Sequence, residues 1–201
     1  MSGVRYLALG DSYTVGEGVG AGAGWPAVLA GLLRAQGVPM DEPQVIARTG
    51  WSCEELERAI DAALPSGPYP LVSLLIGVND QYRGASAEAY GRRFEALLGR
   101  AAEFAGDRTG RVVVLSIPDW GVSPFAEGRD RAAIARGIDA FNATNRAVTI
   151  RHGARYVDIT ASSRAWNASR HFVADGLHPA GAVYAEWANL VLGAAAAALR
   201  V

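Results

Sequence analysis

Short apolar runs alternate with longer helical patterns along this 201-residue chain, and this alternation limits the folds open to it. Runs of aliphatic and β-branched residues bounded by Gly, Pro or polar clusters predict strands at Val4–Leu9, Gln44–Ala47, Leu71–Ile76, Val112–Ile117 and Arg155–Ile159. The third and fourth runs are apolar almost throughout, which is typical of strands buried on both faces of a parallel sheet.

Five longer segments carry apolar residues at helical spacing, namely Trp25–Ala35, Ser52–Ala63, Ser86–Phe104, Arg131–Arg151 and Pro179–Leu199. Ser52 and Glu55 predict a capping box at the start of the second segment, and Pro179 is expected in the first turn of the last. Strands with intervening helices predict an α/β fold: a three-layer α/β/α arrangement with a doubly wound, five-stranded parallel sheet. No linker or repeat divides residues 1–201, so we expect a single domain.

Composition excludes several classes of function. The net charge is −1 and basic residues are not clustered with aromatics, so we expect neither a nucleic acid nor an anionic membrane as partner. The chain has no lysine, which excludes a Walker A phosphate loop, a Schiff-base lysine and a Ser-Lys dyad. Cys53 is the only cysteine, so an intrachain disulfide is excluded. We interpret Cys53 as a small buried side chain.

The apolar stretches are short. The first ten residues are too brief for the apolar core of a signal peptide, and the longest apolar tract, Trp187–Leu199, is too short for a membrane span. These features predict a cytoplasmic location without a membrane span. Sequons at Asn142 and Asn167 are therefore expected to stay unmodified. The oligomeric state stays open.

Chemistry in a doubly wound sheet is expected at the edge formed by the carboxyl ends of the strands. Ser12 follows the first predicted strand, Gly50 the second and Asn79 the third, while Asp175 and His178 precede the last helix. Acyl transfer needs a nucleophilic hydroxyl, an imidazole base, an orienting carboxylate and oxyanion donors, and these loops supply all four. Each residue alone has an ordinary role in a turn or cap. Their combination favours catalysis.

Four segments resemble the sequence blocks of the SGNH (GDSL-type) hydrolase family: Gly10-Asp-Ser12, Gly50, Gly77-Val-Asn79-Asp80 and Asp175-Gly-Leu-His178-Pro179. The resemblance implies a flavodoxin-like sheet and a triad of Ser12, His178 and Asp175. It also implies an oxyanion hole formed by the amides of Ser12 and Gly50 and the side chain of Asn79. Tyr13 stands where leucine is usual, and we interpret it as a packing residue.

These observations predict a serine esterase that cleaves carboxylic esters through an acyl-Ser12 intermediate. We expect small soluble esters with short acyl chains as substrates, and no cofactor. Trp51, Trp120 and Phe125 follow strand ends and either line the acyl pocket or belong to the core. The glycine-rich segment 16–20 is expected to form a loop over the site.

Other functions remain open at this point. An acyltransferase or a thioesterase would use the same triad, and the sequence does not separate them. A phosphate-handling protein built on Asp11 would lack the lysine and second aspartate that such sites use. A non-catalytic binding module would not need the full set of residues. His171, Asp175 and His178 could form a metal cluster, but further ligands are missing, so we expect no metal and interpret His171 as a surface or pocket-rim residue.

Overall fold

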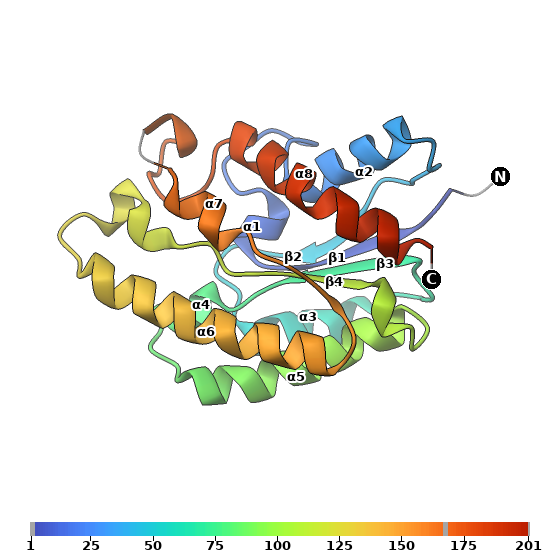
Figure 1. Ribbon diagram of the computed structural model, residues 1–201, viewed down its shortest axis with the longest axis horizontal. Helices are drawn as coiled ribbons and strands as arrows, with labels where there is room; N and C mark the ends of the chain where they lie inside the picture. Colours follow the sequence, from blue (N-terminus) through green and yellow to red (C-terminus); the bar gives the residue numbers. More distant parts are fainter. Residues whose placement is uncertain (1–2, 167–168, 201) are drawn as a thin grey trace.

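A five-stranded, all-parallel sheet forms the centre of the computed structural model, which describes residues 3–166 and 169–200 (Figure 1). The strands are β1 (Tyr6–Gly10), β2 (Gln44–Ala47), β3 (Leu71–Leu75), β4 (Val112–Leu115) and β5 (Arg155–Val157). Their order is β2-β1-β3-β4-β5, the flavodoxin-like order of a doubly wound sheet. Asn167 of the second sequon lies outside the described residues.

Helices cover both faces of the sheet and confirm the three-layer prediction (Figure 1). α2 (Trp25–Ala35) and α8 (Gly181–Ala198) pack together on one face. The other face carries α3 (Cys53–Ala63), α5 (Ala87–Phe104) and α6 (Arg131–Arg151). In the part of the chain that the structure describes, none of the helices is long and apolar enough to cross a membrane.

Shorter elements connect these layers: α1 (Ser12–Val15), α4 (Val78–Tyr82), α7 (Thr160–Arg164), and the 3-10 turns η1 (Thr109–Arg111), η2 (Trp120–Val122), η3 (Pro124–Ala126) and η4 (Ser169–His171). Most of them follow the carboxyl ends of strands. β1 pairs with β3 so that Gly10 lies beside Leu75. The segments that start at Asp11 and Ile76 therefore leave the sheet side by side.

Local signals in the sequence account for the long helices. The Ser52 side chain accepts a hydrogen bond from the Glu55 amide, and the Glu55 carboxylate accepts one from the Ser52 amide, so the predicted capping box is present. Ser86 caps α5 in the same way through the Ala89 amide. Strands β1, β3 and β4 are buried along their whole length because helices pack on both faces.

Several predicted boundaries are wrong: β1 begins at Tyr6 and not at Val4, and other shifts lie at the ends of β4 and β5 and at the start of α8. Strand pairing stops at Leu115 and Val157, two residues before the predicted ends. The Ser116 amide still donates to the Val157 carbonyl at 2.9 Å, but its Oγ accepts the amides of Ile159 and Thr160 at 2.8 and 3.0 Å in place of further ladder bonds. The last helix begins at Gly181 and not at Pro179. Pro179 instead pairs with Phe172 in an isolated antiparallel bridge, which holds it outside the helix.

Candidate active site

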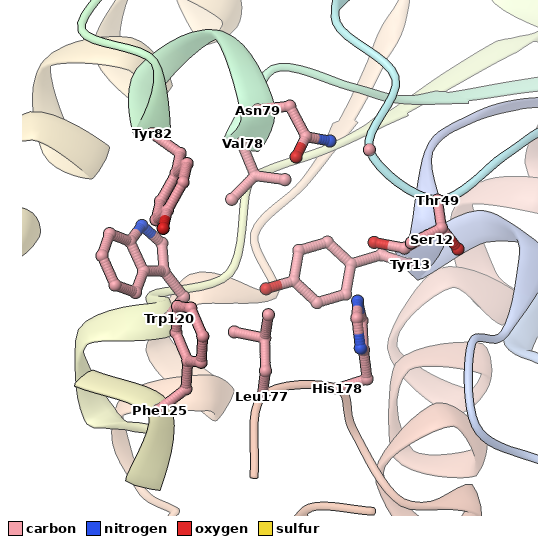
Figure 2. Close-up of a pocket in the computed structure, with 11 residues that line it drawn as sticks. Ser12, Tyr13, Thr49, Val78, Asn79, Tyr82, Trp120, Phe125, Leu177 and His178 are labelled. Carbon is pink, nitrogen blue, oxygen red and sulfur yellow. The ribbon is translucent and has the colours of Figure 1, made fainter. Parts of the chain in front are cut away.

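A pocket opens at the carboxyl edge of the sheet, where the sequence predicted the chemistry (Figure 2). It is lined by Ser12, Tyr13, Thr49, Gly50, Val78, Asn79, Tyr82, Trp120, Phe125, Leu177 and His178. Ser12, Gly50, Asn79 and His178 form what we call the polar side. Tyr82, Trp120 and Phe125 form the aromatic wall. Figure 2 shows the aromatic wall at the opposite end of the pocket from Ser12 and His178.

Ser12 is the first residue of α1, and its neighbour Asp11 caps this helix. The Asp11 carboxylate accepts a hydrogen bond from the Tyr13 amide at 3.0 Å, which fixes the turn directly after β1. The Ser12 amide has no acceptor among the described residues, as expected for the first turn of a helix. The Ser12 side chain therefore lies beside an unpaired backbone donor at the pocket surface.

His178 is buried and bonded to Asp175. Its Nδ1 lies 2.6 Å from Asp175 Oδ2, and Asp175 Oδ1 accepts the amides of Leu177 and His178 at 2.8 and 2.9 Å. Partial burial is the largest influence and raises the pKa of Asp175, but these hydrogen bonds together outweigh it and lower the pKa below its usual range. An ionised Asp175 favours the tautomer with hydrogen on Nδ1, which leaves Nε2 as the acceptor.

Ser12 and His178 lie at the same end of the pocket (Figure 2). No hydrogen bond joins these two described side chains, so the structure shows their proximity and not a formed Ser-His link. The Tyr13 ring packs edge-to-face against His178, with centroids 6.0 Å apart, and against Trp187 at 5.8 Å. Tyr13 is thus the packing residue that the sequence predicted, and one of its partners is the imidazole.

Gly50 occupies the left-handed region, with φ of 87°, where a residue with a Cβ is strained. Its carbonyl accepts a hydrogen bond from Arg83 at 2.7 Å, and Arg83 also pairs with Glu55 at 2.8 Å. In the described part of the chain the Gly50 amide has no acceptor. Arg83 therefore ties the Gly50 turn to the start of α3 and leaves the amide as a possible oxyanion donor.

Asn79 lies in the first turn of α4 and its side chain lines the pocket. Its Nδ2 donates to the Trp51 carbonyl at 2.9 Å. This bond uses one of the two N–H groups of the carboxamide and leaves the other as a donor. Gly77 makes the sharp entry into α4 possible, because its φ is 126° and an added Cβ would lie 2.5 Å from the Tyr90 ring.

Beneath the polar side lies a buried group of acids with Cys53. Burial raises the pKa of Asp11 to about 8, the Tyr13 amide partly opposes this, and Asp80 raises it further. Burial also raises the pKa of Asp80, whose Oδ2 accepts the Cys53 amide at 2.9 Å. The pKa of Cys53 lies well above its usual value because the thiol is buried. Cys53 is thus the buried side chain expected from the sequence, and it is not an activated thiol.

Of the three aromatic residues predicted for the pocket, Trp120 and Phe125 lie in the aromatic wall, and the third is placed elsewhere. Trp51 does not line the pocket. It follows the left-handed turn at Gly50 and packs half-buried against the core, so its contact with the site is the carbonyl that binds Asn79. Tyr82 was missed, although it lies three residues after Asn79 on the same short helix, a spacing that puts both on one face.

Hydrogen bonds join the aromatic wall to two neighbouring segments, α4 and the Asp175–His178 loop. Trp120 Nε1 donates to Gln81 Oε1 on α4 at 2.9 Å. The Phe125 amide donates to the Gly176 carbonyl, in the Asp175–His178 loop, at 3.0 Å. Nothing in the local sequence signals these contacts, because each joins segments far apart in the chain.

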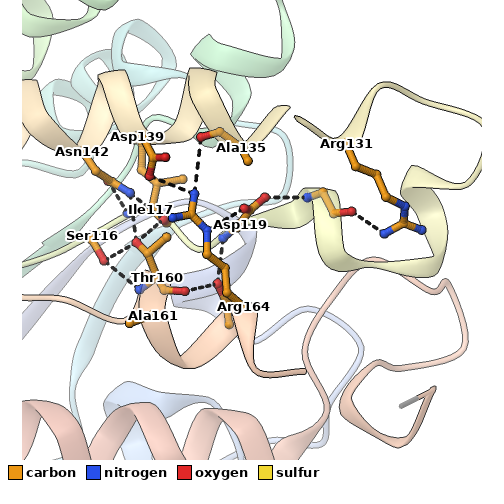
Figure 3. Close-up of polar contacts among 12 residues, drawn as sticks. Ser116, Ile117, Asp119, Arg131, Ala135, Asp139, Asn142, Thr160, Ala161 and Arg164 are labelled. Carbon is orange, nitrogen blue, oxygen red and sulfur yellow. Dashed lines mark hydrogen bonds and ion pairs between the residues drawn. The ribbon is translucent and has the colours of Figure 1, made fainter. Parts of the chain in front are cut away.

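A polar network holds the segment before the aromatic wall in place (Figure 3). Arg164 on α7 pairs with Asp119 at 2.8 Å, and Asp119 also accepts the Gly121 amide at 2.9 Å. Asn142 on α6 bonds both the amide and the carbonyl of Ile117, at 2.8 and 2.9 Å. Buried or half-buried hydrogen bonds of this kind fix the backbone that presents Trp120.

The glycine-rich segment 16–20 and His171 both lie outside the pocket lining. The segment 16–20 does not cover the pocket: none of its residues lines it, Gly16 ends α1 in the left-handed conformation, and Gly18 packs against Val173. His171 stacks on Trp166 outside the pocket lining. Among the described residues, no group of three or more His, Cys, Asp and Glu side chains is arranged to hold a metal ion.

Comparison with known proteins identifies the family of this chain. The model of the GDSL-like Lipase/Acylhydrolase family matches residues 8–186. None of the curated proteins searched matches the chain.

Among solved structures, TesA aligns with a TM-score of 0.73 at 21% identity over 94% of this chain and 97% of its own. Axe2, an acetylxylan esterase from Geobacillus stearothermophilus, aligns with 0.73 at 18% over 96% and 94%. LAE5, an alpha/beta hydrolase enzyme from the Lake Arreo metagenome, aligns with 0.71 at 21% over 98% and 96%. At these identities the likeness shows a shared fold. Because the family model covers most of the sequence, the chain belongs to the GDSL-like lipase/acylhydrolase family and is a carboxylic ester hydrolase.

Proposed function

We propose that the chain is a serine esterase that cleaves small carboxylic esters through an acyl-Ser12 intermediate. The observation that carries this proposal is the shared pocket of Ser12, Gly50, Asn79 and His178, with Asp175 bonded to His178 Nδ1 at 2.6 Å. A hydroxyl, an imidazole held by a carboxylate and several unpaired N–H donors are the groups that acyl transfer requires.

In the first half-reaction, His178 Nε2 takes the proton of Ser12 Oγ as the oxygen attacks the ester carbonyl carbon. The new carbon–oxygen bond forms, and the carbonyl oxygen becomes an oxyanion that accepts hydrogen bonds from the amides of Ser12 and Gly50 and from Asn79 Nδ2. Collapse of this intermediate breaks the bond to the alcohol, which leaves with the proton from His178. In the second half-reaction, His178 Nε2 takes a proton from water as the water oxygen attacks the acyl carbon. Collapse of this second intermediate breaks the bond to Ser12 Oγ, which regains a proton from His178, and the acid is released.

Asp175 acts through the imidazole. Its lowered pKa keeps it ionised, so that it orients the ring and stabilises the imidazolium formed during each proton transfer. It accepts no proton itself.

The pocket supports the preference for short acyl groups. The aromatic wall stands opposite the polar side (Figure 2) and limits the length of the group that fits between them. An apolar acyl or alcohol group gains most there, because Tyr82, Trp120 and Phe125 offer apolar ring surface. The single domain and the cytoplasmic location stay predictions from the sequence.

The test is hydrolysis of p-nitrophenyl esters from acetate to palmitate by the wild type and by Ser12→Ala. We expect hydrolysis of the short esters, and a loss of roughly 10⁵–10⁶-fold in the variant by analogy with other serine hydrolases. A phosphonate probe should label Ser12 in the wild type. Analysis of the products with an added alcohol separates hydrolysis from acyl transfer, and a thioester substrate tests thioesterase activity. Full activity in Ser12→Ala would disprove the proposal.

A further inference from the structure

The guanidinium of Arg129 lies over all three rings of the aromatic wall. The distances from its Cζ to the ring centroids are 4.9 Å for Phe125, 5.5 Å for Tyr82 and 5.6 Å for Trp120. The three rings also contact one another, with centroids 5.4 to 6.3 Å apart. These rings line the pocket whereas Arg129 does not, so its guanidinium lies just outside the pocket, against the wall remote from Ser12.

Arg129 has few other partners. It is exposed, and in the part of the chain that the structure describes the only hydrogen bond of its guanidinium goes from Nη2 to Tyr82 Oη at 3.3 Å. A guanidinium has five N–H donors, so most of these donors have no acceptor in the protein. Glu127 and Asp130 are close in sequence, yet neither of these two described residues forms an ion pair with Arg129, and the Asp130 carboxylate instead accepts the Ala133 amide.

Three other arginines near the pocket form ion pairs or hydrogen bonds within the protein. Arg83 pairs with Glu55, and Arg164 pairs with Asp119 and Asp139. Arg131 donates to the carbonyls of Gly121 and Ser123 and so supports the aromatic wall from behind. These three residues have structural partners that account for their positions. The guanidinium of Arg129 instead lies on aromatic rings, and most of its N–H groups have no acceptor in the described part of the protein.

We propose that Arg129 selects esters that carry a carboxylate at the end remote from the ester bond, with the apolar part of the substrate against the aromatic wall. This inference rests on the proposed esterase function. The planar fork of a guanidinium matches a carboxylate and binds it through two parallel hydrogen bonds. Stacking on aromatic rings restricts the side chain, so less conformational freedom is lost when the anion binds.

A cationic substrate is the opposing interpretation, because three aromatic rings around a guanidinium resemble a cage for a quaternary ammonium group. Such a substrate would have to displace Arg129, whereas a carboxylate binds with Arg129 in place. The sign of the preferred charge therefore decides between the two.

The experiment compares substrates of matched size and different charge. Monoethyl adipate against ethyl hexanoate puts the carboxylate on the acyl side, and 4-acetoxybutanoate against butyl acetate puts it on the alcohol side. Acetylcholine against 3,3-dimethylbutyl acetate tests a cation. Initial rates are measured by pH-stat titration for the wild type, Arg129→Gln, Arg129→Lys and Arg108→Gln. Arg108 is an exposed arginine next to η1, at the amino edge of the sheet, and its variant changes the net charge equally.

We expect the wild type to prefer the anionic member of at least one pair by about tenfold in kcat/KM, the size of a charge-assisted hydrogen bond. This ratio should disappear in Arg129→Gln, persist in part in Arg129→Lys and stay unchanged in Arg108→Gln. It should also fall as salt is raised, since Arg129 is exposed. No preference for the anion in the wild type, a preference that survives in Arg129→Gln, or a preference for acetylcholine would overturn the inference.

The two proposals can fail separately. Ser12-dependent hydrolysis of the neutral esters without any preference for anions leaves the esterase function and removes the role of Arg129. If the wild type hydrolyses none of the esters, their binding to Ser12→Ala and to Ser12→Ala with Arg129→Gln, measured by calorimetry, still tests the selection. Weaker binding of monoethyl adipate to the double variant supports the role of Arg129, and equal binding overturns it.

Discussion

Ser12 and His178 on the polar side are held by a different kind of contact from the aromatic wall, whereas Gly50 and Asn79 bond Arg83 and Trp51, which lie 33 and 28 residues away. On the polar side, Asp11 bonds the amide two residues further along the chain, and Asp175 bonds the amides two and three residues further. The aromatic wall depends on bonds between distant segments: Trp120 and Gln81 are 39 residues apart, and Arg164 and Asp119 are 45 apart. Short-range bonds leave a pattern in the sequence, whereas long-range bonds leave none.

The difference predicts different effects of mutation. Substitutions on the polar side should lower kcat, because those groups act in the transition state. Substitutions that loosen the aromatic wall should act on stability and KM, because they alter a surface that binds substrate.

The largest effect after loss of Ser12 is expected for Asp175→Asn. The variant keeps an oxygen for the amides of Leu177 and His178, so the loop should stay folded, but the imidazole loses its ionised partner. We expect kcat/KM to fall by up to about 10⁴ with little change in thermal stability. Asp61→Asn is the matched control, since Asp61 is an exposed carboxylate on α3. Activity near the wild-type level in Asp175→Asn would remove Asp175 from the mechanism.

A smaller loss is expected for Asn79→Ala, which removes the side-chain donor to the oxyanion. By analogy with single donors elsewhere, kcat should fall by about 10²–10³ with a small change in KM. Steady-state kinetics on p-nitrophenyl butyrate measures both constants. Asn189→Ala on α8 serves as control. A rise in KM with kcat unchanged would mean that Asn79 binds the ground state and the transition state equally and does not stabilise the oxyanion selectively.

Asp11 makes the stability of the fold beside the polar side depend on pH. Its folded pKa of about 8 is above the usual value, so the protonated form stabilises the fold. This contribution is complete below about pH 4 and is lost as the pH rises towards 8, by at most about 1.4 kcal/mol per pH unit.

Urea unfolding of the wild type and Asp11→Asn from pH 5 to 9 measures this contribution. The stability of the wild type relative to the variant should fall up to about pH 8 and then level off, because above that pH Asp11 is ionised in both the folded and the unfolded protein. Parallel curves over the whole range would show that Asp11 is ionised in the folded protein.

The smallest effect is expected at the Trp120–Gln81 bond. Gln81→Met removes the acceptor of Trp120 Nε1, and Trp120→Phe removes the donor. In a double-mutant cycle we expect a coupling of about 1 kcal/mol in unfolding and a rise of a few-fold in KM. Purely additive effects would show that the bond does not hold the aromatic wall.

Much of the architecture could be predicted from the sequence. The bounds of α2 and α6 agree with the predicted segments, and the cap at Ser52 lies where the pattern indicates. The polar side was predicted residue by residue, because each member follows a strand end or lies in a short local turn. The error at Pro179 arose because this residue pairs with Phe172, seven positions earlier, and the errors after β4 and β5 arose because Ser116 Oγ bonds the amides of Ile159 and Thr160.

The sequence by itself determined the alternating α/β order, the capped helices and the Asp175–His178 pair, because the interactions behind them join residues within one or two turns of chain. Only the tertiary structure decided that Trp51 turns to the core, that Tyr82 joins Trp120 and Phe125, and that Arg129 lies across them. These arrangements depend on how α4, α6 and α7 pack around one loop, and packing between distant segments has no periodic signature in the sequence.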